Sequence, residues 1–246
     1  MDRALRGGSA VFAMGMAAMG ILTLARLDFS PVLIALPPDL PGRVAVAAIS
    51  GICLIGAAVT ILLDRRPRVG ALTIASVLSL GALLHALPFF THSASPVWAV
   101  AFESIVLASA AWALTDLLGE LSNGARVAAR IGFAISLFAF GIFHFVYHAY
   151  IERVIPAWIP GNLFWTYGIG CALIAAGVAV LTGVQVRLAT TLLAIMFASW
   201  VVIVHAPRVA ASPANADEWS SMIIALSCCG ASLIMRAGAA RRHRSH

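Results

Sequence analysis

The sequence predicts an all-α integral membrane protein with eight transmembrane helices, arranged as two parallel four-helix repeats. Of its 246 residues, 61% are hydrophobic and 11% are charged, and the mean hydropathy is +0.97. In an average soluble domain, about half of the residues are apolar and about a quarter are charged. The composition therefore excludes a disordered chain, a coiled coil and an ordinary water-soluble enzyme. It predicts that the chain lies in a lipid bilayer.

Eight apolar runs are long enough to cross a bilayer. A hydrocarbon core about 30 Å thick needs about 20 residues at a rise of about 1.5 Å per residue. Backbone polar groups must be paired in lipid, and no run alternates with the period of two that a barrel strand requires, so each run is expected to be a helix. The expected spans are residues 9–27, 44–63, 69–87, 97–114, 131–149, 163–181, 188–206 and 219–235.

The arginines predict the orientation of these spans. All sixteen basic residues are Arg. The links on the side of the N-terminus hold most of them, and short cytoplasmic loops are rich in positive charge. Both termini are therefore expected in the cytoplasm of a bacterial-type inner membrane. The net charge is +6. The basic residues are scattered between apolar runs and form no cluster large enough for a nucleic-acid groove, so no nucleic-acid partner is predicted.

The two halves of the chain repeat one another. The segment Pro37-Pro-Asp-Leu-Pro41-Gly42 recurs as Pro156-Ala-Trp-Ile-Pro160-Gly161, and the third span of each half ends in a His-Ala pair, His85-Ala86 and His205-Ala206. Four spans per half is an even number, so the halves enter the membrane with the same orientation. We expect an N-terminal repeat at residues 1–118 and a C-terminal repeat at residues 119–246.

The C-terminal repeat resembles the DoxX-like family of four-helix membrane proteins over residues 126–235. The resemblance lies in the motifs Gly141-Ile-Phe-His144-Phe145, Ile155-Pro-Ala-Trp-Ile-Pro160-Gly161, Leu173-Ile-Ala-Ala-Gly177, Arg187-Leu-Ala and Glu218-Trp219. The N-terminal repeat has Thr23 and Leu24 where the motif has His144 and Phe145. It therefore looks like a degenerate copy of the C-terminal repeat. The resemblance implies a cytoplasmic-membrane protein linked to oxidoreductases, including a small subunit of a thiosulfate:quinone oxidoreductase.

Five titratable side chains are expected at one depth near the outer leaflet. His144 and His148 are four residues apart, which predicts one face of the fifth span. His85 and His205 close the third and seventh spans. Glu103 is the only acid well inside a span, about 9 Å below its start at 1.5 Å per residue. Because ionisable groups are costly in lipid and usually face the bundle interior, we expect these five to share one pocket.

In this pocket, Glu103 and His144 are the candidate catalytic groups. The candidate cofactor-binding residues are His144, His148, His205, His85 and Trp158, the last as part of an aromatic cover over the histidines. Three chemistries fit: haem ligation, hydrogen bonds to a quinone head group, or a three-imidazole zinc or copper site formed by His144, His148 and His205. The identity of a metal stays open. A purely structural role, as a hydrogen bond to a neighbouring helix, fits His85 and His205 equally well.

The resulting functional hypothesis is a membrane subunit that handles electrons or protons at the outer leaflet, with quinone or haem, beside a redox partner protein. The alternative is a non-enzymatic transporter, carrier or assembly factor. The four cysteines form no C-x-x-C motif and are expected to behave as small apolar residues. The sequence leaves the substrate, the cofactor and the oligomeric state open.

Overall fold

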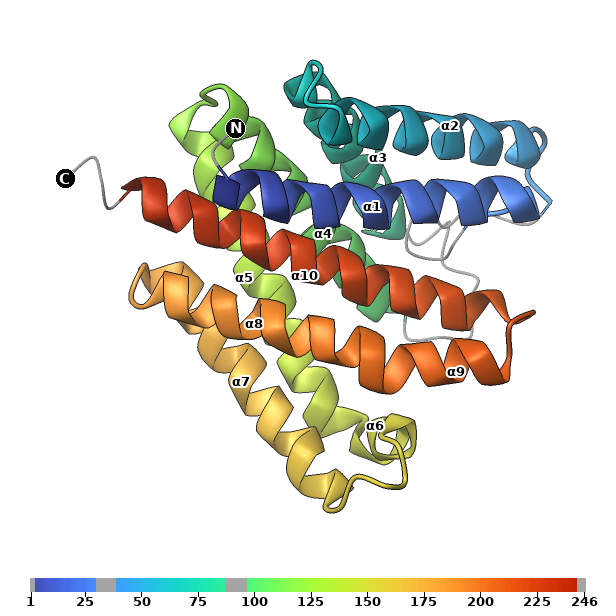
Figure 1. The fold of residues 1–246 in the computed structure, drawn as a ribbon, viewed down its shortest axis with the longest axis vertical. Helices are drawn as coiled ribbons and strands as arrows, with labels where there is room; N and C mark the ends of the chain where they lie inside the picture. The colour runs from blue at the N-terminus through green and yellow to red at the C-terminus, as the bar shows by residue number, and fades with distance from the viewer. Residues whose placement is uncertain (1–2, 30–38, 87–96, 243–246) are drawn as a thin grey trace.

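The computed structural model describes residues 3–29, 39–86 and 97–242, and this part of the chain is helical without a strand (Figure 1). Eight helices are long and apolar enough to cross a membrane, which confirms the predicted fold class. The elements are α1 (Arg3–Arg26), α2 (Arg43–Leu62), α3 (Pro67–Ala86), α4 (Val97–Leu118), α5 (Asn123–Val146), α6 (His148–Val154), α7 (Asn162–Thr182), α8 (Val186–Trp200), the π-helix η2 (Val201–His205), α9 (Ala206–Ala211) and α10 (Ala216–Arg242).

The fifth span differs from its expected bounds at both ends. Helix α5 begins at Asn123, where the Ser122 side chain accepts a hydrogen bond from the Ala125 backbone N–H. A serine at this position pairs one of the backbone donors that a helix start leaves open, so the helix begins well before its apolar run. The helix ends at Val146, because Tyr147 leaves the helical region with φ −109° and ψ 29°.

The seventh span is longer than expected and contains a wider turn. Helix α8 continues through η2 into α9, and the Ala206 backbone N–H donates to the carbonyl of Val201, five residues back. Pro207 follows at the start of α9. Proline has no N–H and its ring clashes with the carbonyl four residues before it, so a regular α-turn is disfavoured here and the π-turn accommodates it.

The helices pack in the same order in both halves. Helix α1 packs on α2, α2 on α3 and α3 on α4; α5 packs on α7, α7 on α8 and α8 on α10. Between the halves, α1 packs on α10 and α5 on α4, and α4 and α10 also meet. Figure 1 shows α1 and α10 side by side, with the start of α1 and the end of α10 at one end of the bundle. Each contact in one half therefore has a counterpart in the other.

Pairs of glycines mark the closest helix crossings. A Cβ added at Gly20 would lie 2.6 Å from the carbonyl oxygen of Gly51, and one at Gly51 would lie 2.9 Å from that of Gly20. Gly141 and Gly170 approach each other in the same reciprocal way, at 2.8 and 3.1 Å. Small residues allow two membrane helices to pack backbone to backbone. The α1–α2 and α5–α7 crossings are thus built alike.

The repeated loop motif also has a common ending. Gly42 before α2 and Gly161 before α7 have φ values of 80° and 77°, a left-handed conformation that glycine adopts at little cost. The start of the first motif at residues 37–38 lies outside the described residues, as does the end of the third expected span at residue 87.

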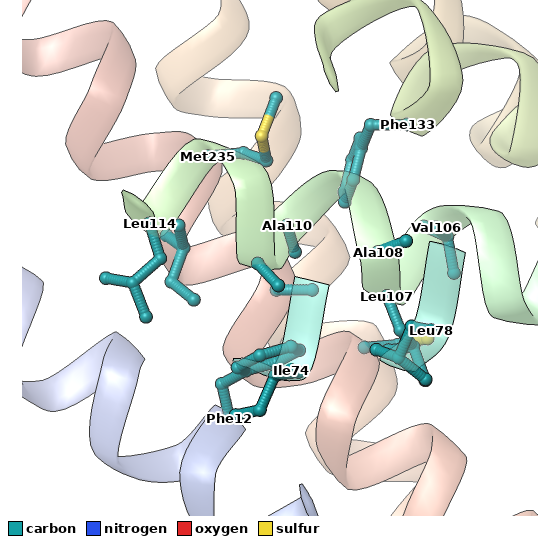
Figure 2. Packing of buried hydrophobic residues seen from close by; sticks show 14 of the residues in the cluster. Phe12, Ile74, Leu78, Val106, Leu107, Ala108, Ala110, Leu114, Phe133 and Met235 are labelled. Carbon is teal, nitrogen blue, oxygen red and sulfur yellow. The ribbon is translucent and has the colours of Figure 1, made fainter. Parts of the chain in front are cut away.

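The core is centred on α4. Figure 2 shows Phe12 of α1, Ile74 and Leu78 of α3, Phe133 of α5 and Met235 of α10 around residues 106–114 of α4. Large apolar side chains also cover the outside of the bundle, as a lipid-facing surface requires. Examples are Ile49, Ile52, Leu192 and Val202.

Candidate functional site

The predicted site residues all lie toward the end of the bundle opposite its termini, but they form separate groups. His85, His144 and His205 each stand in the last turn of their helices. Glu103 stands early in α4, and α6 follows α5 at the same end. The helices that carry them pack against different neighbours.

His144 belongs to an aromatic layer, which we define as Phe102 of α4, Phe140, Phe143, His144 and Tyr147 at the end of α5, and Phe197 and Trp200 of α8. The His144 ring is stacked on Trp200, with centroids 6.1 Å apart and an interplanar angle of 26°. Phe143 contacts Phe102 by a ring edge, at 6.5 Å between centroids. Helices α4 and α8 are thereby joined to α5 through ring contacts.

The backbone fixes the tautomer of His144. Its Nδ1 lies 2.7 Å from the carbonyl oxygen of Phe140. A carbonyl oxygen can only accept a hydrogen bond, so Nδ1 carries the hydrogen and, in the neutral ring, Nε2 bears the lone pair. His144 is therefore oriented to accept a proton or to ligate through Nε2.

The expectation that His148 lies on the same helix as His144 is wrong. The helix breaks at Tyr147, so His148 opens α6 instead of continuing α5. Its Nδ1 lies 2.9 Å from the Glu152 carboxylate, and its ring contacts Tyr167 of α7 at 5.8 Å. His148 thus belongs to a group on α6 and α7, while the His144 ring stacks on Trp200 of α8.

His205 has a polar atom without a partner in the part of the chain that the structure describes. Its Nδ1 is buried and makes no hydrogen bond with any described residue. In the α-helical turns at His144 and His85, Nδ1 bonds the carbonyl four residues back. At His205 the chain is a π-helix, and the carbonyl at that position, that of Val201, accepts the Ala206 N–H. Buried polar atoms are nearly always paired, and π-turns are frequent at functional sites, so this nitrogen is a candidate ligand contact.

An arginine–glutamate pair beside His205 was not predicted as part of the site. Arg208 donates from Nε and from a terminal nitrogen to the two carboxylate oxygens of Glu218, both at 2.7 Å. Both charges lie within electrostatic range of His205, and Tyr150 of α6 contacts Arg208. The pair joins α9 to α10 and holds η2 against α10. Glu218 stands in the Glu218-Trp219 motif on which the resemblance to the DoxX-like family was based, and this was the available signal.

Glu103 faces another part of the bundle. Phe102 points to α5, and Glu103 follows it about 100° around the helix. Glu103 lies within electrostatic range of Cys228 on α10 and makes no hydrogen bond or ion pair with the residues that the structure describes. It therefore stands at the α4–α10 contact between the two halves.

The two remaining candidates lie further from the aromatic layer. His85 is buried on α3, which packs on α2 and α4, and its Nδ1 lies 2.7 Å from the Gly81 carbonyl. Trp158 lies between α6 and α7 with its side chain 70% exposed, so it packs against little of the described chain. Its role in covering the histidines stays a prediction.

The three-imidazole metal set finds no support in the geometry. Within residues 3–29, 39–86 and 97–242, no three His, Cys, Asp or Glu side chains come close enough together to hold a metal ion. The helix breaks at Tyr147, and the His148 ring contacts Tyr167 of α7 whereas the His144 ring stacks on Trp200 of α8.

Comparison with known proteins adds one family. A family model described as a domain of unknown function, DUF8561, matches residues 133–234, from α5 into α10. No curated protein and no solved structure matches the chain. The matched region lies within the half that carries His144, His205 and the Arg208–Glu218 pair.

Proposed function

We propose that this chain is a membrane component that handles protons and electrons at the end of the bundle opposite its termini. The redox molecule is a quinone, which is bound by its head group. The proposal rests on the geometry of His144. Its ring is stacked on Trp200, and its Nδ1 faces the Phe140 carbonyl, so that Nε2 carries the lone pair of the neutral ring. The resemblance of the surrounding motif to the DoxX-like family agrees with this class of function.

Side chains of these kinds suit a flat ring with polar edges. Aromatic side chains of the layer offer stacking surfaces, since offset and edge contacts between rings are favourable. A quinone, when bound, carries two electrons and two protons between membrane components. His144 takes up a proton at Nε2 while Nδ1–H keeps its bond to Phe140, so the ring does not reorient. Imidazole and indole side chains can transfer protons and hold a ring in position, but they do not supply electrons. The electrons therefore require a redox partner protein.

The arginine distribution supports the placement of this end at the outer leaflet of a bacterial-type cytoplasmic membrane, with both termini in the cytoplasm. Haem is the second candidate, favoured by the unmet Nδ1 of His205, because a second imidazole is what six-coordinate haem iron needs. An absorption spectrum of the protein purified in detergent separates the two, since only the haem protein shows a Soret band. No described contact favours a transporter or carrier specifically.

The test is a titration of the purified protein in nanodiscs with a short-chain ubiquinone, followed by tryptophan fluorescence. His144→Asn keeps a donor for the Phe140 carbonyl but lacks Nε2, and it should weaken binding by about tenfold, or about 1.4 kcal/mol. His148→Asn is the matched control, because His148 belongs to the Glu152 and Tyr167 group. Equal affinity of wild type and His144→Asn would remove the basis of the proposal.

A further inference from the structure

A second polar site lies at the opposite end of the bundle, near the chain termini. A cavity of about 260 Å³ opens between the end of α4, the start of α5 and the end of α10. Three arginines line it, Arg126 and Arg130 from α5 and Arg241 from α10, against the two carboxylates of Asp116 and Glu120. The volume far exceeds the roughly 30 Å³ that one water occupies in the liquid.

The three arginines differ in how many hydrogen-bond and ion-pair partners their guanidinium groups have. Arg126 lies 3.2 Å from the Asp116 carboxylate and also donates to the Leu121 carbonyl. Arg241 donates to the Leu117 carbonyl at 3.0 Å, at the last turn of α4. Arg130 makes no hydrogen bond or ion pair within the described chain, and its Nε is buried. Asp116 is already paired with Arg126. A guanidinium is always charged and carries five N–H donors, so Arg130 can accept a further anion as its partner.

The lining changes from charged to apolar along the helices. On α10 it runs from Arg241 through Gly238 to Met235 and Ile234, toward the middle of the membrane span. An inorganic anion needs only the charged part, whereas a phospholipid has a phosphate followed by glycerol and acyl chains. Basic pockets between membrane helices on the cytoplasmic side bind such head groups.

We propose that the cavity formed by α4, α5 and α10 binds a phosphate group, supplied by the head group of an anionic phospholipid. Arg130 provides the principal contact, in the paired N–H geometry with which arginine holds phosphate. Arg241 adds a second charge from α10, and Asp116 keeps Arg126 turned toward the α4 side of the cavity. A bound lipid would thereby join the two halves at this end.

The test uses the full-length protein in neutral detergent, titrated with short-chain phosphatidylglycerol and followed by native mass spectrometry. Phosphatidylcholine, which has the same apolar part, is expected to bind at least about tenfold more weakly. Arg130→Gln should lower the phosphatidylglycerol affinity by about tenfold. The matched control is Arg187→Gln, which removes an exposed arginine at the same end of the bundle outside the cavity and should change affinity by less than about twofold.

Two further arms complete the design. Inorganic phosphate at millimolar concentration should not displace the lipid; displacement would assign the same arginine site to a free phosphate. If Arg130→Gln fails to fold, Arg241→Gln provides the test from α10, with an expected loss of about fivefold. Equal binding of the two lipids, or wild-type affinity in both arginine variants, would overturn the proposal.

Discussion

Substitution of Gly170 by alanine is the sharpest test of how the α5–α7 crossing positions His144. The added Cβ would lie 2.9 Å from the Cβ of His144 and 3.1 Å from the backbone oxygen of Gly141. Neither atom is the end of a flexible side chain, so α7 must move away from α5. Overpacking of this kind costs about 1–3 kcal/mol. The gain in helix propensity from glycine to alanine, about 1 kcal/mol, opposes it.

Gly168 on the same helix is the matched control, because a Cβ there meets nothing within 4 Å. Its change to alanine has the same gain in helix propensity without the clash, so Gly170→Ala should be less stable than Gly168→Ala by about 1–3 kcal/mol. The free energy of unfolding can be measured by titration with SDS in mixed micelles, followed by far-UV circular dichroism. If Gly170→Ala proves as stable as Gly168→Ala, the close crossing described above is wrong.

Three further predictions concern other parts of the chain. Glu218→Gln breaks a half-buried, two-bond pair and should lower the free energy of unfolding by about 1.5–3 kcal/mol, whereas Asp64→Asn breaks an exposed pair and should cost less than about 1 kcal/mol; similar losses in SDS titration would contradict this ranking. Thr23→Ala should leave quinone affinity within about twofold of wild type, while His144→Ala reduces it by about tenfold or more; comparable losses would refute the difference between the halves. A cysteine at Ala214, in a background without reactive cysteines, should react with an impermeant maleimide only from outside the cell, and labelling only from the cytoplasm would invert the orientation.

The membrane spans could be predicted from the sequence because lipid leaves few alternatives. A backbone in hydrocarbon must pair its own polar groups, so length and apolar composition nearly determine a helix. The alignment of the repeats also extends to single contacts. Thr23 bonds the carbonyl of Met19 as His144 bonds that of Phe140, and Leu24 lies against Gly51 as Phe145 lies against Gly170.

The grouping of the site residues could not be predicted in the same way. A count of four residues places His148 on the face of His144 only if the helix continues, and the break at Tyr147 has no proline or glycine to signal it. The unmet nitrogen of His205 depends on a π-turn, which shifts the backbone bonds by one residue. The pairing of Arg208 with Glu218 depends on how α9 meets α10, and periodicity within one helix carries no information about that contact.

The packing of α1 on α10 has a consequence for biosynthesis. Helix α1 leaves the ribosome long before α10, yet the two fit closely: a Cβ added at Gly230 would lie 2.3 Å from the backbone nitrogen of Phe12, and one at Gly15 would lie 2.1 Å from the Ser227 hydroxyl. Until α10 has been inserted, this face of α1 cannot make these contacts. The N-terminal repeat therefore cannot complete its packing before the C-terminal repeat has been inserted. A chain interrupted before α10 exposes the face of α1 that α10 would cover, and membrane proteases can recognise it.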